Sequence, residues 1–589
     1  MSSEVRTATA SMNAVMRHVH HLNDTTPFRK SGSGQDLQAG RYVVDTLNGY
    51  GLDAYLEEFE TFDSDPGEAT VEIIGPGGRP ISARACAHIE PTPVEGYIGE
   101  IIDVGPGAEA DYRGRDVTGK IVLAEVSYAP ATPEKARIAA SKGAAGIVLM
   151  NWGQGDEPGV PWRALKAVWG NPTPESWNEI PRLFGVSISR RDGEAIRELL
   201  AKGPVMIKAK VTAKREWRKV SQPIAWLHAP KESPERDKFV IVSGHIDSWS
   251  PGLTDNISGN SVMLEVARNL AAIRDKLRRS VVFCFWNGHE VAEAAGSAYF
   301  VDMHWEKINR DAVAYFNIDS VGMKGTNLMN VASCAELAAF VRRIAEGTMA
   351  GAGPVVVSNL TRVGDQSFFG VGVSAATGRH GFSPETVKRY NGATLGWYNH
   401  TEFDTLDQLD EKALSLDFTY WDSVVRELTT TVVLPHRFLP RVDDLADRMT
   451  RMLAGKDDTA GLSGILTAIA SLRSYVAWFD QYMDVLSAQK DATEHAVMRA
   501  NGVVLRIARG LTFISSSASG KYQQDSYGVS TLMLPIPFLS ALEDYAASAL
   551  NSLERKLLLT KLLRLRHVVT DALQAVEDTL SDLQASVRI

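Results

Sequence analysis

The chain contains few cysteines. Cys86, Cys284 and Cys334 are the only three in 589 residues. Three cysteines are too few, and odd in number, to form the disulfide framework of a small secreted domain. Cys284 lies inside the apolar run 281–286, where a core residue is expected. A leader with an apolar centre is absent, as is any run of about 18 apolar residues. We therefore expect a cytoplasmic protein without a membrane span.

The chain also has fewer basic residues than acidic ones. The 62 Lys and Arg residues are outnumbered by 71 Asp and Glu residues, which gives a net charge of −9. A chain with this balance lacks the basic footprint that nucleic-acid binding requires, so we expect no nucleic-acid partner. Hydrophobic residues make up 44% of the sequence, enough to bury a sizeable core. The length corresponds to roughly three or four domains.

Five hydrophobic runs end in a side chain that can bind a metal ion. They are 242–247 (VSGHID), 254–256 (TDN), 285–290 (FWNGHE), 317–319 (NID) and 397–401 (WYNHT). Zinc takes nitrogen and oxygen ligands in a compact shell, and catalytic zinc sites leave one position open for water. Two imidazoles and three carboxylates therefore suit two zinc ions that share one bridging carboxylate.

The surrounding sequence predicts the fold that would gather these ligands. Between residues 217 and about 435, apolar runs alternate with helical spacing, as at 239–243, 259–277, 280–286, 292–302 and 312–319. This rhythm is typical of an α/β domain with a mostly parallel sheet and helices on both faces. In such sheets, ligands bind just beyond the carboxyl ends of the strands, which is where the five segments place their side chains.

The flanking residues carry a family resemblance. Gly296-Ser297 follows the third segment, 400–405 (HTEFDT) closes the series, and 364–369 (GDQSFF) lies between the fourth and fifth segments. Together with the five segments, these motifs resemble the co-catalytic zinc aminopeptidases, within the glutamate carboxypeptidase and transferrin-receptor branch.

The resemblance implies a role for each residue. Asp255 would bridge the two ions, and Asp247 would steady the first imidazole. The implied metal ligands are His245, Asp255, Glu290, Asp319 and His400.

One departure lies at the centre of this pattern. The family has Glu-Glu where the chain has His289-Glu290. Counted from Trp286, His289 takes the position of the general base and Glu290 that of the ligand, with one extra residue before Gly296. Counted back from Gly296, Glu290 would be the base and Val291 would stand at the ligand position, which it cannot fill. We prefer the first frame, in which a neutral imidazole can accept a proton because its ordinary pKa lies near working pH. His289 could equally be a third imidazole ligand.

Glu293 follows His289 at a spacing of four. On a helix this spacing would place both side chains on one face. The pair lacks the second histidine of the His-Glu-x-x-His zinc motif, so we expect Glu293 to be a solvated helix residue or a substrate contact rather than part of another zinc site.

The rest of the chain divides into further domains. Residues 1–65 resemble the N-terminal part of the peptidase domain, 66–216 resemble the inserted, β-rich protease-associated domain of this branch, and 217–435 form the zinc peptidase domain. Residues 436–589 carry apolar residues at spacings of three and four, which indicates long helices. By position and length they resemble the family's dimerisation domain, which implies a homodimer. The loop expected between residues 513 and 525 can reach a partner's active site in such relatives.

The predicted reaction is metal-dependent hydrolysis of an amide bond in a small molecule or short peptide, as in an aminopeptidase or carboxypeptidase. The proposed substrate contacts are Arg362, Arg379, His380 and Tyr390. Four tryptophans between 152 and 177 could line the substrate site or anchor an irregular loop. The alternatives are a lyase or cyclotransferase that uses His289, and a non-catalytic protein of the receptor type.

Overall fold

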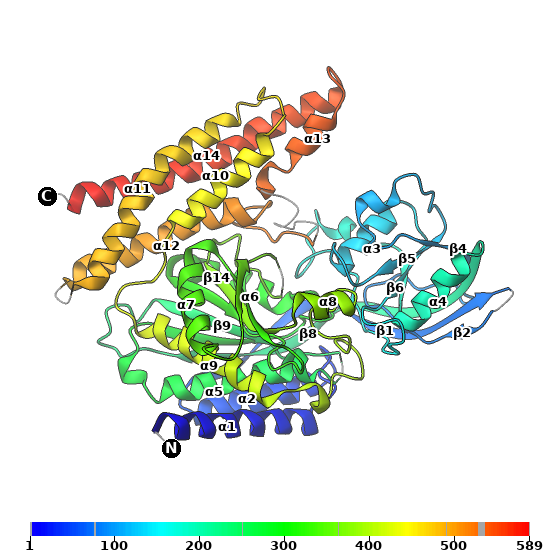
Figure 1. The fold of residues 1–589 in the computed structure, drawn as a ribbon, viewed down its shortest axis with the longest axis horizontal. Coiled ribbons are helices and arrows are strands. Elements are labelled where there is room, and N and C mark those ends of the chain that lie inside the picture. Colours follow the sequence, from blue (N-terminus) through cyan, green and yellow to red (C-terminus); the bar gives the residue numbers. More distant parts are fainter. Residues whose placement is uncertain are drawn as a thin grey trace.

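The computed structural model describes residues 3–75, 78–249, 251–362, 364–489, 492–527 and 536–587. Figure 1 shows three bodies: an α/β domain that contains the N-terminal helices, a smaller β-rich domain beside it, and a layer of long helices above. The described helices include none that is both long and apolar enough to cross a membrane.

The α/β domain is built on a mostly parallel sheet, as the alternating pattern predicted. Its strand order is β13-β12-β14-β11-β9-β10-β8. The inner pairs β10–β9, β9–β11 and β11–β14 are parallel, while β12–β14 and β10–β8 are antiparallel. The strands are β8 (Val205–Leu227), β9 (Phe239–His245), β10 (Ser280–Trp286), β11 (Ala312–Asn317), β12 (Leu328–Ser333), β13 (Val355–Asn359) and β14 (Ala375–Gly381).

Helices cover both faces of this sheet. Val240 and Val242 of β9 pack in the same core as α5 (Ser258–Ala271) and α9 (Glu411–Thr430), whereas Phe239 and Ile241 pack in a second core with α6 (Ala295–Asp311). Because side chains alternate along a strand, β9 is buried along its whole length. The other helices of this domain are α1 (Ser3–Thr25), α2 (Gln35–Gly49), α7 (Ala338–Thr348) and α8 (Pro384–Arg389).

Two long strands join the α/β domain to the β-rich domain. β1 (Asp53–Ile74) and β8 pair antiparallel along almost their full length, from Asp53 opposite Trp226 to Ile74 opposite Met206. Both strands run across the expected domain limits at 65/66 and 216/217, and the register shifts once, between Pro66 and Ala69. The smaller domain adds β2 (Pro80–Ile81), β3 (Ala83–Ala85), β4 (Tyr97–Asp103), β5 (Ile121–Glu125), β6 (Gly146–Met150), β7 (Phe184–Ile188), α3 (Thr132–Ser141) and α4 (Arg190–Leu200).

The C-terminal part is helical, as the apolar spacing predicted. It comprises α10 (Leu439–Leu453), α11 (Ser463–Ala488), α12 (Glu494–Ser516), α13 (Ala541–Ala547) and α14 (Leu553–Val587). The loop expected from residue 513 begins only at Ser517, where α12 ends. This loop packs against the α/β domain of its own chain, since Arg362 lies 2.9 Å from Asp525.

One expected helix begins later than predicted. Residues 287–294 form turns, and α6 begins at Ala295 instead of Ala292. Glu293 and Ala294 have φ angles of 51° and 61°, in the left-handed region that a right-handed helix excludes. The expectation that Glu293 is a solvated helix residue is therefore wrong, because Glu293 precedes α6 and is 8% exposed.

Candidate metal centre

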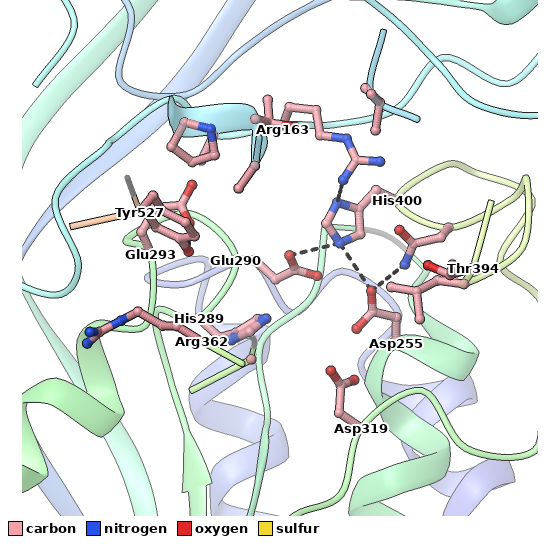
Figure 2. A pocket seen from close by; sticks show the side chains of 18 of the residues that line it. Arg163, Asp255, His289, Glu290, Glu293, Asp319, Arg362, Thr394, His400 and Tyr527 are labelled. Carbon is pink, nitrogen blue, oxygen red and sulfur yellow. Dashed lines mark hydrogen bonds and ion pairs between the residues drawn. The ribbon is translucent and has the colours of Figure 1, made fainter. Parts of the chain in front are cut away.

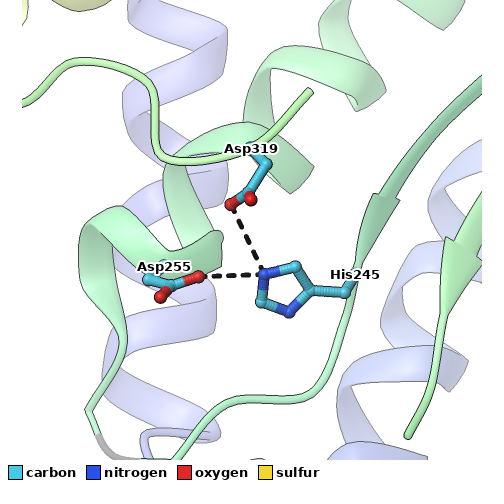
Figure 3. A group of neighbouring side chains, drawn as sticks. All are labelled: His245, Asp255 and Asp319. Atoms are coloured by element: carbon cyan, nitrogen blue, oxygen red, sulfur yellow. Dashed lines mark hydrogen bonds and ion pairs between the residues drawn. The ribbon is translucent and has the colours of Figure 1, made fainter. Parts of the chain in front are cut away.

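Three predicted ligands meet at the end of β9. His245 Nε2 lies 2.9 Å from Asp255 Oδ1 and 3.4 Å from Asp319 Oδ1 (Figure 3). His245 is the last residue of β9, Asp255 lies in the short helix η3 (Leu253–Ile257), and Asp319 comes two residues after β11. One ligand atom from each of the three lies within 4.8 Å of the others, close enough to hold a single metal ion.

A second group shares Asp255 with the first. His400 Nε2 lies 3.1 Å from Asp255 Oδ2 and 3.1 Å from Glu290 Oε2 (Figure 2). These three side chains also offer ligand atoms within 4.8 Å of one another. Each group uses a different oxygen of Asp255, which is the arrangement expected of a carboxylate that bridges two ions.

The donor atoms are of the types that zinc binds. His245 Nδ1 donates to the backbone oxygen of Asp247 at 2.8 Å, which leaves Nε2 free to bind a metal. His400 Nδ1 likewise faces the Trp162 carbonyl at 3.3 Å. Glu290 Oε1 is buried and has no hydrogen-bond partner within the described residues, so this carboxylate has a free acceptor. Neutral imidazoles and carboxylates are the ligands of catalytic zinc sites.

Both imidazoles of the donor set lie among negatively charged carboxylates. Burial disfavours the charged form of His245, but Asp255 and Asp319 outweigh burial and hold the pKa of His245 well above its usual value. His400 behaves in the same way, because Glu290 and Asp255 overcome burial and raise its pKa to about 9. Packed carboxylates of this kind need positive charge, which protons or metal ions can supply.

Asp247 organises the loop that carries Glu290. Its carboxylate accepts the backbone N–H groups of His289 at 3.2 Å and Glu290 at 3.0 Å. The same side chain lies 3.8 Å from His245 Nδ1. Asp247 therefore fixes the third segment relative to the first, which agrees with the steadying role that the resemblance implies.

The structure distinguishes between the two possible alignments of the sequence around Glu290. Glu290 belongs to the second donor group, whereas Val291 is fully buried in an apolar cluster with Ala87, Ala164 and Trp249. This geometry agrees with the frame counted from Trp286, in which Glu290 is the ligand.

His289 is placed beside the donors but not among them. Its ring stacks on the ring of His245 with centroids 4.0 Å apart. Its Nδ1 lies 3.0 Å from Asp365 Oδ2. Burial disfavours the imidazolium, but Asp365 outweighs burial and raises the pKa of His289 to about 10. His289 is thus held by a carboxylate, and it is absent from both described donor groups.

Four of the five donors line a cavity of about 620 Å³. Its wall includes Asp255, Glu290, Asp319, His400 and His289. The α/β domain supplies these residues, the β-rich domain adds Trp152 and Arg163, and the C-terminal loop adds Tyr527. All three parts of the chain therefore enclose the space above the candidate metal centre.

The four predicted substrate contacts fall in different places. Arg362 and Arg379 line the cavity. Arg362 is paired with Asp525 and lies over the ring of Trp169, whereas Arg379 donates to the Asp319 backbone oxygen at 3.1 Å.

The structure does not bring the other two to this cavity. His380 follows Arg379 on β14, so its side chain points to the opposite face, where it contacts Asp417 at 2.9 Å. Tyr390 lines a separate cavity of about 210 Å³ next to α8.

Sequence reasoning missed several cavity residues. Arg163 Nη1 lies 3.1 Å from His400 Nδ1, while its Nε and Nη2 are buried without a hydrogen-bond partner among the described residues. Trp152 was one of four tryptophans noted, and it does line the cavity. Trp169 instead anchors its loop by donating to Ser367 at 2.8 Å. No local sequence pattern marks Arg163, because it reaches the site only where the β-rich domain packs against the α/β domain.

The structure thus combines a mostly parallel sheet with two donor groups that share the carboxylate of Asp255. Residues 226–417 match peptidase family M28, and residues 89–196 match the PA domain. The two matches follow one another in the order that the sequence resemblance predicted, with the PA domain before the peptidase region.

Several known proteins are similar to this chain. Aminopeptidase YwaD of Bacillus subtilis is 28% identical over 310 residues, which cover 52% of this chain and 60% of that protein. The probable glutamate carboxypeptidase AMP1 of Arabidopsis thaliana is 22% identical over 78% of this chain and 73% of its own length. The probable glutamate carboxypeptidase VP8 of Zea mays is 25% identical, and the match spans 49% of this chain and 48% of that protein. The chain thus matches only about half to three fifths of the maize and Bacillus proteins.

Solved structures share the fold. A zinc aminopeptidase from Bacillus subtilis superposes with a TM-score of 0.54 at 22% identity, over 71% of this chain and 95% of its own. A peptidase M28 precursor from Shewanella amazonensis gives a TM-score of 0.58 at 18% identity, over 74% and 98% of the two chains.

Proposed function

We propose that the protein is a zinc-dependent hydrolase that cleaves a peptide-like amide bond in a small molecule or short peptide. The observation that carries this proposal is the pair of donor groups, joined through Asp255, on the wall of one cavity. His245, Asp255 and Asp319 would hold one zinc ion, and Asp255, Glu290 and His400 the other. Two zinc ions in these groups would polarise the scissile carbonyl and lower the pKa of a water molecule to about 7.

His289 is the residue best placed to accept a proton from the attacking water. Asp365 Oδ2 lies 3.0 Å from its Nδ1 and attracts the ring proton to that nitrogen. A carboxylate at Nδ1 favours the tautomer whose other nitrogen can accept a proton. Positive charge on His289 is disfavoured when dications occupy the neighbouring donors, which opposes the effect of Asp365 on its pKa.

Arg163 is the residue best placed to hold the substrate. If a metal binds His400 Nε2, Nδ1 must carry the ring proton, and it then donates to the Trp162 carbonyl. Arg163 can then no longer donate to that nitrogen. Its guanidinium, whose Nε and Nη2 have no hydrogen-bond partner in the described part of the chain, is free to bind a carbonyl or an anionic group of the substrate.

A non-catalytic protein of the receptor type is disfavoured, because all five donors come together. A lyase or cyclotransferase would use the same metals, so only the products distinguish it from a hydrolase.

The test of the proposed hydrolase function is zinc content by mass spectrometry, combined with a product screen over amide, ester and carbamate substrates. Release of an amine and a carboxylate by the zinc-loaded protein supports the proposal. A zinc-loaded protein that leaves every amide intact would rule it out.

We further propose that the protein acts as a homodimer formed through its C-terminal helices. The support is an apolar patch at the start of α14, where Leu550, Leu553 and Leu557 are 80%, 74% and 62% exposed. Burial of such a patch against a second copy removes apolar surface from water. A cytoplasmic location stays a prediction.

A further inference from the structure

The loop between β10 and α6 has an unusual backbone. Glu293 and Ala294 both occupy the left-handed region, with φ angles of 51° and 61°. Residues other than glycine adopt this conformation rarely, and such strain persists only where surrounding contacts impose it. The loop follows Glu290 directly, so the strain lies beside the candidate metal centre.

The β-rich domain imposes that backbone through three consecutive carbonyl groups. His88 Nε2 donates to the Val291 oxygen at 2.9 Å, and Lys166 Nζ donates to the Ala292 oxygen at 2.5 Å. The N–H of Gly170 donates to the Glu293 oxygen at 2.8 Å. These bonds hold the loop in one conformation and fix the direction of the Glu293 side chain.

That side chain lies in the wall of the cavity. Glu293 is only 8% exposed, and it lines the same cavity as Asp255, Glu290 and His400. Its carboxyl accepts a hydrogen bond from the hydroxyl of Tyr527, a residue of the C-terminal loop. Figure 2 shows this pair beside Glu290.

The surroundings of Glu293 favour its protonated form. Burial raises the pKa of Glu293 to about 8, although the Tyr527 hydrogen bond and the positive charges of Lys166 and His289 oppose the rise. The Lys166 ammonium donates to the backbone oxygens of Phe62, Gly170 and Ala292. The charged or titratable groups that act on Glu293 are Lys166 and Arg163 of the β-rich domain, His289 and Glu290 of its own loop, and Tyr527.

We propose that Glu293 is the general acid that protonates the nitrogen leaving the scissile amide, and that Tyr527 is the positioning residue that holds its carboxyl. This proposal rests on the hydrolase function proposed above. As the C–N bond breaks, its electron pair passes to nitrogen, which takes the proton of the Glu293 carboxyl. The carboxylate so formed regains a proton from solvent, or from the attacking water by way of His289. Acid and base are then separate residues, on opposite sides of Glu290 in the sequence.

The test compares leaving groups. In Glu293→Gln the side chain keeps its size and can still bind Tyr527, but it has no acidic proton. We expect turnover of a dipeptide, whose amine leaves poorly, to fall by about two to four orders of magnitude, the usual contribution of a positioned acid. Turnover of a matched p-nitroanilide, whose amine needs less protonation, should fall by at most about tenfold. Equal losses with both substrates would overturn the proposal.

The pH profile supplies a second readout. Glu293 must be protonated to act, so wild-type turnover should decline at high pH, and Glu293→Gln should lack that decline. Tyr527→Phe removes a hydrogen bond that favours the carboxylate, so the decline should move to higher pH. A purely structural role for Tyr527 would lower turnover without moving the profile, and that result would count against the proposal.

A third measurement separates this inference from the function on which it rests. In infrared difference spectra of the substrate-free protein, wild type minus Glu293→Gln, a carboxylic acid band should be present at about pH 6.5 and gone by about pH 9.5. Absence of that band would overturn the role of Glu293 even in an active hydrolase. If the band is present but the wild type cleaves no amide, the proposed function has failed and the acid role fails with it. Circular dichroism and zinc content equal to wild type confirm that each variant is folded.

Discussion

Asp255 is the residue on which both donor groups depend. Its Oδ1 faces His245 and its Oδ2 faces His400, so one substitution removes a ligand from two sites at once. We expect wild-type protein to bind about two zinc ions per chain and Asp255→Ala to bind almost none. Zinc analysis of the purified variants measures this directly.

The control for this substitution is Asp302→Asn. Asp302 is an exposed acid on α6 that lines a separate cavity of about 530 Å³. It should keep both ions. Normal zinc content in Asp255→Ala would show that the ligand assignment is wrong.

His289 tests the base and ligand roles against each other. If it accepts the proton of the attacking water, His289→Ala should keep both zinc ions and lose about two to four orders of magnitude in turnover. If it is instead a third imidazole ligand, zinc and turnover should fall together. Zinc content and turnover are therefore measured on the same sample. Asp365→Asn should weaken turnover in the same direction, because it removes the carboxylate that faces Nδ1. Full zinc and full turnover in His289→Ala would end the mechanistic role proposed for this residue.

His245, Glu290 and Asp319 could be predicted as donors because each lies at or shortly after the end of a strand of its own. Asp255 instead lies in η3, and His400 lies in a turn that no strand precedes directly. His245 and Asp319 lie at or just beyond the ends of parallel neighbours, and the spacing along the chain already placed them at one edge of the sheet. Arg163 and Tyr527 could not be found in this way. They reach the cavity only because separate domains pack against it, and no local pattern encodes that contact.

At the scale of elements, the turn after β10 shows the limit of helical periodicity. Apolar residues from 292 onward suggested a helix, but hydrogen bonds from His88, Lys166 and Gly170 hold the carbonyls of 291–293 outside helical geometry. Tertiary contacts therefore override local propensity over these three residues. The mostly parallel sheet and the long C-terminal helices were predicted correctly, because their patterns extend over many residues.

The packing of α1 makes an element-scale prediction about pH. His18 of α1 lies 2.7 Å from the Tyr42 hydroxyl and 3.1 Å from that of Tyr50. Burial lowers the pKa of His18 from 6.5 to about 4, so the folded state binds a proton less readily than the unfolded state. The stability that His18 contributes is thus fully present above pH 6.5 and is lost as pH falls toward 4.

We expect the free energy of opening of α1 to fall by about 2 kcal/mol between about pH 7 and pH 5. Amide hydrogen exchange in α1, corrected for the intrinsic exchange rate, measures this change. His18→Leu should abolish the pH dependence while α1 remains folded. Retention of the full dependence in that variant would assign it to other groups.

At the scale of the whole molecule, the C-terminal helices are joined to the peptidase domain by buried polar contacts. Arg509 of α12 donates to the carbonyl oxygens of Asn309 at 2.9 Å, Ile308 at 3.0 Å, Gly372 at 3.0 Å and Ala312 at 2.5 Å. Deletion of residues from about 440 onward would leave these carbonyls and a broad apolar surface without partners. The remaining protein should be insoluble or inactive, so such a deletion is a poor test of oligomeric state.

Point substitutions on α14 test the dimer more sharply. Leu553 and Leu562 are nine residues apart, which places them on opposite faces of the helix. Leu562 is fully buried against the bundle, whereas Leu553 and Leu557 are 74% and 62% exposed. If these two leucines form the interface, changing both to Gln should convert a dimer into a monomer without loss of helix, because they make no contribution to the core of their own chain. Light scattering coupled to size-exclusion chromatography gives the mass, and circular dichroism gives the helix content.

The matched control is Met303→Gln. Met303 is an apolar residue of α6 that is 57% exposed, and its substitution should leave the mass unchanged. A dimer that survives the double substitution would place the interface elsewhere, and a wild-type monomer would refute the homodimer itself.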